Sequence, residues 1–265
     1  MKLGVMPGDT IPKAELKGEG FAAMQLFWGT GADVAAKDPT PEELASALAE
    51  GDLALAAMAF HIGLVGPNGR VDADVERTVD LVGRTSALSA HKGDNPRPIL
   101  VWHPSRYPED GDPDDAAIFD GLCRALVDAC CAAEAADVDI AVEITRAGSV
   151  GSAETFLHLV DRVGSRALKA CIDAANFCPD RTPLVRAVRC LAPHIAIAHG
   201  KDASFKDNGE VDTYGPTGSG RLDYDTFTKS LLEFVPELPY FVLEYYRSRE
   251  DLLKARDIVL TAMDK

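Results

Sequence analysis

Four side chains of the kind that bind metal ions each follow a short, largely apolar run of this chain. They are Glu143, Asp173, His199 and Glu244, and they follow the runs 138–142, 168–172, 195–198 and 240–243. Short apolar runs of this kind predict buried parallel strands. A polar residue at the carboxyl end of such a strand points into the mouth of an α/β barrel, where its chemistry is done. Three carboxylates and one imidazole converging there predict a site for a divalent metal ion.

Strand-like and helix-like segments alternate from one end of the chain to the other. We expect strands at 2–6, 21–27, 53–61, 98–103, 138–143, 168–173, 194–199 and 240–244. We expect helices at 41–50, 73–90, 113–136, 152–163, 183–191, 224–234 and 248–263, with a short or broken first helix within 9–17. Eight such units in 265 residues predict a single-domain α/β protein, a (β/α)8 TIM barrel over 1–265, because this fold typically needs about 250 residues. A doubly wound sheet is the alternative, but no Gly-x-Gly-x-x-Gly follows the first strand.

Local signals support the helix starts and mark two long connections. Thr40 precedes a proline and two glutamates, as an N-cap residue does, and the segment starting at Ser248 resembles a capping box. The connections 102–111 and 200–221 follow the fourth and seventh strands. Loops of this length in a compact domain usually carry function or move. Both are expected on the face that carries the four ligand-type residues.

Charge and hydropathy limit the partners of this protein. The formal net charge is −15, and an acidic surface repels phosphate backbones, which argues against nucleic acid as a partner. The apolar stretch at the start is too short for a signal peptide, and the longest uncharged apolar stretch, 53–65, is too short to span a bilayer. We therefore expect a cytoplasmic protein without a membrane partner.

The order Glu, Asp, His, Glu at the ends of strands five to eight resembles the xylose-isomerase-like TIM barrel superfamily, the group of the sugar phosphate isomerases and epimerases. The segment His199-Gly200-Lys201-Asp202 strengthens the resemblance, as does the Gly-x-Gly within 218–224. The resemblance implies a divalent-metal-dependent isomerase or epimerase with a small sugar or polyol as substrate. It leaves the subfamily open, and a homo-oligomer is compatible with it.

Two positions depart from subfamilies within this group. Ketose 3-epimerases usually carry His three residues after the metal Asp and Arg six residues after the metal His, where this chain has Asn176 and Phe205. Endonuclease IV proteins bind three zinc ions. His61 and His103 match two of their additional histidines, but Asn176 replaces another. One metal ion is therefore expected rather than three.

The expected chemistry is proton transfer beside a carbonyl. Mixed carboxylate and imidazole ligands suit Mn²⁺, Mg²⁺ or Co²⁺, with Zn²⁺ as a further candidate. A bound ion polarises a carbonyl, and Glu143 and Glu244, three strands apart, are the expected catalytic acid and base. A lyase or dehydratase acting on a keto-sugar or inosose begins with the same step. An endonuclease IV-like repair enzyme and a non-catalytic sugar-binding barrel are the more distant alternatives.

Further residues are candidates for substrate contact, and each has a structural alternative. His61 and His103 would contact hydroxyl groups or be hydrogen-bonded barrel histidines. Lys201 would stabilise a developing enediolate or pair with Asp202. The remaining candidates are Asn176 as a donor to sugar oxygens, Trp28 and Trp102 as an apolar wall or as packing, and Arg146 as an anion contact or a surface residue.

Overall fold

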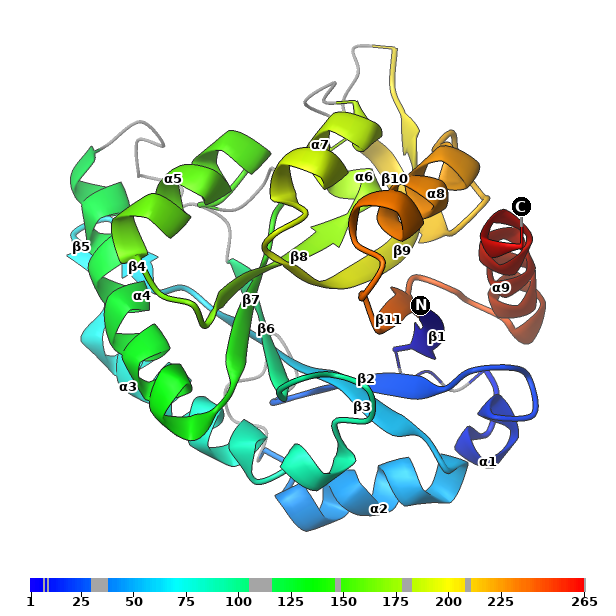
Figure 1. The fold of residues 1–265 in the computed structure, drawn as a ribbon, viewed down its shortest axis with the longest axis horizontal. Helices are drawn as coiled ribbons and strands as arrows, with labels where there is room; N and C mark the ends of the chain where they lie inside the picture. Colours follow the sequence, from blue (N-terminus) through cyan, green and yellow to red (C-terminus); the bar gives the residue numbers. More distant parts are fainter. Residues whose placement is uncertain are drawn as a thin grey trace.

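The protein folds as a closed barrel of eight parallel strands surrounded by helices (Figure 1). The computed structural model describes residues 1–6, 8, 10–29, 38–104, 116–145, 149–177, 183–207 and 211–264. In this part of the chain, each strand pairs in parallel with the next, and β8 pairs with β9 to close the ring. The barrel strands are β1 (Lys2–Val5), β2 (Ala23–Phe27), β3 (Ala54–Ile62), β6 (Ile99–Pro104), β7 (Asp139–Glu143), β8 (Leu168–Asp173), β9 (Ile195–Phe205) and β11 (Tyr240–Leu243). The expected TIM barrel is confirmed.

The helices follow the strands and lie around the outside of the barrel (Figure 1). Thr40 caps α2 as the sequence predicts and forms a full capping box with Glu43. The Ser248 hydroxyl accepts from the Asp251 amide, but the Asp251 carboxylate accepts from the amide of Arg247 instead of that of Ser248, so only half of the expected capping box forms. The helices are α1 (Lys13–Leu16), α2 (Pro41–Gly51), α3 (Asp72–Ser86), η1 (Ser89–His91), α4 (Ala116–Ala136), α5 (Ala153–Val163), α6 (Ala174–Phe177), α7 (Leu184–Leu191), α8 (Tyr224–Phe234) and α9 (Arg249–Met263). In the described part of the chain, no helix is both long and apolar enough to cross a membrane.

Strand alternation decides which residues face the inside of the barrel. Ala141, Cys171, Ile197 and Val242 belong to one buried cluster of mostly small side chains. Each lies two residues before one of the four ligand-type residues, and side chains two apart on a strand point to the same face. The interior cluster therefore forms a floor, and the ligand-type side chains stand above it at the carboxyl ends of the strands.

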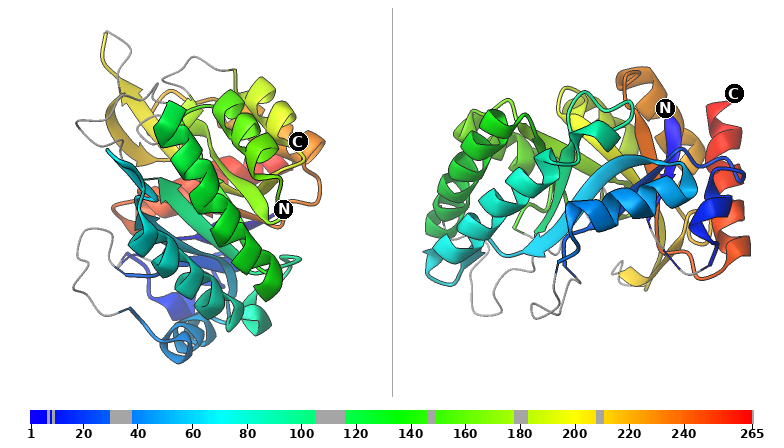
Figure 2. Two further views of the ribbon diagram at one scale, coloured as in Figure 1. Left: turned by 90° about the vertical axis from the view of Figure 1, so that its left-hand side faces the viewer. Right: turned by 90° about the horizontal axis from the view of Figure 1, so that it is seen from below.

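The segment after the seventh strand differs from the expected long loop. β9 continues past His199 to Phe205 and pairs antiparallel with β10 (Val211–Pro216). The resulting hairpin extends beyond the body of the barrel (Figure 2). A second small hairpin joins β4 (Val65–Gly66) and β5 (Gly69–Arg70), and the expected helix 73–90 ends at Ser86, with η1 following it. Most of the expected loop 102–111 lies outside the described residues.

Candidate metal centre

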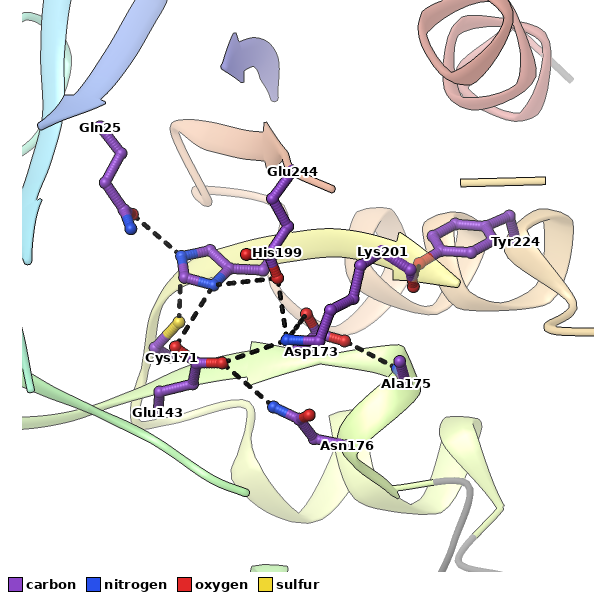
Figure 3. Close-up of polar contacts among 10 residues, drawn as sticks. All are labelled: Gln25, Glu143, Cys171, Asp173, Ala175, Asn176, His199, Lys201, Tyr224 and Glu244. Carbon is purple, nitrogen blue, oxygen red and sulfur yellow. Dashed lines mark hydrogen bonds and ion pairs between the residues drawn. The ribbon is translucent and has the colours of Figure 1, made fainter. Parts of the chain in front are cut away.

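Barrel closure brings the four ligand-type side chains together at the strand ends (Figure 3). Glu143 ends β7, Asp173 ends β8, His199 lies within β9, and Glu244 directly follows β11. One ligand atom from each lies within 4.8 Å of the others. Asp173 and His199 are completely buried, and the two glutamates are at most 7% exposed. The set offers three carboxylates and one imidazole nitrogen to a single point.

Lys201 places a positive charge among the same carboxylates. Its ammonium nitrogen lies 2.9 Å from Glu244 Oε1, 3.1 Å from Asp173 Oδ2 and 3.4 Å from Glu143 Oε1 (Figure 3). Lys201 is two residues beyond His199 on the same strand, so both side chains point into the barrel. Its backbone carbonyl accepts the Tyr224 hydroxyl, which anchors this part of β9 to α8. The side chain is therefore part of the site rather than of a surface loop.

Burial and charge act against each other in this cluster, and the outcome differs between the carboxylates. Burial opposes ionisation of Glu143, but the Lys201 ammonium lowers the pKa of its carboxyl to about 2. Burial likewise opposes ionisation of Glu244, and the Lys201 ammonium lowers its pKa. For Asp173, burial and the adjoining glutamates raise the pKa well above 3.8 despite Lys201. Both glutamates are thus ionised, while Asp173 is the carboxyl group that holds a proton most readily.

His199 presents one ring nitrogen to the carboxylates and the other to the far side of the barrel. Its Nδ1 lies 3.7 Å from Glu143 Oε2 and 4.0 Å from Glu244 Oε1, and it has no hydrogen-bond partner among the described residues. Its Nε2 lies 2.9 Å from the side-chain oxygen of Gln25 on β2. Burial lowers the pKa of His199 although the glutamates act in the opposite direction, which favours the neutral imidazole that metal ions require.

These groups fit a divalent cation. A buried imidazole nitrogen with no hydrogen-bond partner among the described residues faces two ionised carboxylates and a third that is fully enclosed. Packing three carboxylates this closely is unfavourable without positive charge, and oxygen ligands with one nitrogen suit Mn²⁺, Mg²⁺ or a similar ion. Glu143, Asp173, His199 and Glu244 would hold the ion, and the Lys201 ammonium now occupies part of the space between them.

A cavity of about 440 Å³ opens above the cluster. Its polar lining includes both glutamates, Lys201, and the stacked imidazoles of His61 and His103, whose ring centres are 4.6 Å apart. Burial and the neighbouring His103 lower the pKa of His61. Tyr245 also lines the cavity, is 50% exposed and has a φ of +60°, a conformation that is unfavourable for a bulky residue. The cavity thus combines hydrogen-bonding groups with an aromatic surface.

Comparison with known proteins identifies the family. The family described as xylose isomerase-like TIM barrel matches residues 14–263. The chain belongs to this family. A search of curated proteins finds no match.

Several solved structures share the fold at low sequence identity. D-psicose 3-epimerase from Clostridium cellulolyticum H10, solved with D-tagatose, is 13% identical with a TM-score of 0.68, covering 100% of this chain and 97% of that one. The probable 3-DHS dehydratase AsbF from Bacillus anthracis is 16% identical with a TM-score of 0.73, covering 98% and 99%. A family protein from Mycobacterium smegmatis in complex with magnesium is 16% identical with a TM-score of 0.67, covering 95% and 86%.

Some of the expected contact residues line the cavity and others do not. His61, His103 and Lys201 line the cavity. Trp28 and Trp102 are at most 4% exposed and do not line it; their indole nitrogens donate to the Thr85 hydroxyl and to the Ile62 carbonyl. Both tryptophans therefore serve core packing and do not form the apolar wall of the cavity.

The remaining expected contacts change or fall outside the described residues. Asn176 is buried in α6, and its amide nitrogen donates to Glu143 Oε1 at 3.1 Å, so it contacts a metal-ligand candidate instead of lining the cavity. Arg146 lies outside the described residues. Asp202 does not pair with Lys201 in the described structure. Its carboxylate accepts from the backbone amides of Ala203, Gly218 and Leu222, which ties the segment after β10 to β9.

Sequence reasoning missed three contributors to this site. Gln25 lies within an apolar strand, and a polar residue in such a run was the signal that could have identified it. Tyr214 on β10 and Tyr245 contact each other with ring centres 5.5 Å apart, and the Lys201 ammonium lies 5.5 Å from each ring. No sequence pattern marks the two tyrosines, because the extension of β9 brings them together.

Proposed function

We propose that this protein is a divalent-metal-dependent sugar isomerase or epimerase that moves a proton at a carbon beside a carbonyl group. The observation that carries the proposal is the convergence of four ligand atoms within 4.8 Å of one another at the floor of a cavity. The substrate class is a small sugar, keto-sugar or polyol. The epimerase and the probable dehydratase among the structural neighbours are in keeping with this class.

A bound ion would polarise the substrate carbonyl and so acidify the adjoining C–H bond. Glu143 and Glu244 both line the cavity, at the carboxyl ends of the fifth and eighth barrel strands. Both are ionised, as a base must be, since the Lys201 ammonium outweighs the effect of burial on each pKa. One carboxylate would remove the proton from carbon. The carboxyl group so formed would return that proton to the neighbouring carbon in an isomerisation. In an epimerisation the other glutamate, after taking up a proton from solvent, would deliver it to the opposite face.

Lys201 and the two histidines would stabilise the substrate during this transfer. The Lys201 ammonium is the positively charged side chain that the structure places at the cavity floor, so it would neutralise charge that develops on the substrate oxygen. His61 and His103 would bind hydroxyl groups from the neighbouring wall of the cavity. Asn176 would act indirectly, since its amide orients Glu143.

Elimination is the second candidate reaction, since it begins with the same abstraction. The chain matches a probable dehydratase over 98% of its length, and the residues described above serve either outcome. The product distinguishes them: isomerisation and epimerisation conserve substrate mass, whereas elimination releases water. Asn176 and Phe205 stand where ketose 3-epimerases usually carry His and Arg, which also favours a substrate other than the simple free hexuloses.

The decisive experiment combines metal analysis with a substrate screen in D₂O. We expect about one divalent ion per chain and carbon-bound deuterium in a keto-sugar or polyol substrate. Glu143→Gln and Glu244→Gln, compared at saturating metal, should each lower kcat by about 10²–10⁴-fold, because Gln cannot accept a proton. Cys131→Ala, on an exposed face of α4, is the control and should leave kcat unchanged. Near wild-type exchange in both Gln variants would exclude the two-carboxylate mechanism.

A further inference from the structure

Gln25 reaches across the barrel to the imidazole of His199. It lies on β2, which is separated from β9 by β1 and β11 in the order of strands around the barrel. It shares the inward face of its strand with Ala23 and Phe27, and it is 1% exposed. Its side-chain oxygen lies 2.9 Å from His199 Nε2 (Figure 3). The contact therefore links positions 174 residues apart in the chain.

The direction of this hydrogen bond determines which imidazole nitrogen is bare, that is, without a proton and with its lone pair free. A neutral imidazole carries one N–H, and an amide oxygen can only accept. The proton must then be on Nε2, which donates to Gln25, and Nδ1 keeps its lone pair. That nitrogen is the one facing Glu143 and Glu244 at 3.7 and 4.0 Å without a hydrogen-bond partner in the described structure. Tautomer and ring orientation are thus set from the side opposite to the carboxylates.

We propose that Gln25 is a positioning residue, whose amide oxygen holds His199 in the Nε2–H tautomer so that the bare Nδ1 is presented to the divalent ion. The proposal rests on the metal-dependent function proposed above. Outer hydrogen bonds of this kind usually change metal affinity by about 10–100-fold when they are removed. The thiol of Cys171 also lies 3.4 Å from Nε2, but sulfur is a weak acceptor and would not replace the amide.

The first test needs neither metal nor substrate. Metal-free protein labelled with ¹⁵N-histidine is studied by long-range ¹H–¹⁵N NMR at pH 8, and His199 is assigned by the loss of its signals in His199→Gln. The wild-type spectrum should show a protonated Nε2 and an unprotonated Nδ1. Gln25→Leu, which keeps the approximate volume but removes the acceptor, should give a mixture of tautomers. A wild-type Nδ1–H tautomer, or an unchanged tautomer in Gln25→Leu, would overturn the proposal.

The second test measures Mn²⁺ affinity by isothermal titration calorimetry on the same proteins. Gln25→Leu should bind Mn²⁺ about 10–100-fold more weakly than the wild type. Cys171→Ala is the matched control, because it removes the other neighbour of Nε2 while leaving the amide, and its affinity should change by less than about threefold. Equal weakening in both variants, or none in Gln25→Leu, contradicts the positioning role. If the wild-type protein binds no divalent ion, the proposed function fails, whereas the NMR result still decides whether Gln25 orients His199.

Discussion

The Lys201 ammonium acts as the internal counter-ion of the carboxylate cluster, and this leads to a specific prediction for Lys201→Met. Methionine keeps a long unbranched side chain but removes the charge. In metal-free protein, the change leaves Glu143, Asp173 and Glu244 without the cation that lies 2.9–3.4 Å from each of them. We expect the variant to be clearly less stable than the wild type when a chelator is present.

The magnitude follows from the burial of the whole cluster. Lys201 is 5% exposed and its three partners are at most 7% exposed. Removing one partner from a buried ionic group costs about 3–5 kcal/mol. For a protein of roughly this size, each kcal/mol lowers Tm by about 2–4 °C, so the expected decrease is roughly 6–20 °C. Burial lowers the pKa of Lys201, but the three carboxylates outweigh burial and hold this pKa well above 10.5, so the loss should appear throughout the neutral range.

Metal ions should reverse the effect. A divalent ion supplies the positive charge that methionine lacks, and no ammonium has to move aside. Mn²⁺ should therefore raise Tm more in Lys201→Met than in the wild type, and Mn²⁺ should bind the variant more tightly. The assays are thermal unfolding with chelator or with Mn²⁺ and calorimetric titration. Lys229→Met is the control, since Lys229 pairs with Asp225 on the surface at 2.6 Å, and an exposed helical pair of this kind contributes only about 0.3–0.5 kcal/mol.

Two results would refute this reasoning. The first is a free energy of unfolding of metal-free Lys201→Met that lies within about 1 kcal/mol of the wild-type value, well below the cost of breaking a buried ion pair. It would mean that the carboxylates do not depend on the ammonium. An unchanged or weaker Mn²⁺ affinity would mean that Lys201 and the ion do not compete for the same space. Either result would leave the four ligand candidates in place but remove Lys201 from the charge balance of the site.

Three further predictions concern protons and local structure. Burial and the adjoining glutamates raise the pKa of Asp173, so binding of an ion to its carboxylate should release a proton. Mn²⁺ affinity should therefore fall as pH falls. In calorimetric titrations, the binding enthalpy should depend on the ionisation enthalpy of the buffer. The pKa of Glu143 is lowered from 4.5 to about 2, so this group contributes stability above pH 4.5 that is lost as pH falls toward 2. Urea titrations of metal-free wild type and Glu143→Gln measure this loss. Over that pH range, the unfolding free energy of the wild type should fall relative to that of the variant. Asp202→Ala removes the acceptor of three backbone amides and should cost roughly 1.5–3 kcal/mol, seen as a lower Tm, whereas an unchanged Tm would show that water satisfies these amides.

Much of the barrel and the identity of the four ligand candidates could be predicted from the sequence. Local patterns carry this information, because an apolar run predicts a strand and the residue that closes it lies at the strand end. The spacing of two between Ala141 and Glu143, or between Val242 and Glu244, also places the ligand candidates on the inward face. Helix starts at Thr40 and Ser248 are local in the same sense, since a cap depends on residues three apart.

Only the tertiary structure decided which distant side chains share the site. Lys201 contacts Glu143 and Glu244 because β9 continues beyond His199, and no pattern within 200–221 distinguishes that continuation from a loop. Gln25 meets His199 only because β2 lies across the barrel from β9. Trp28, which ends an apolar run as a contact residue would, turns instead to Thr85 because helix packing offers its indole a buried partner. Local periodicity determines the face of each side chain, whereas the distance between strands depends on how the ring closes.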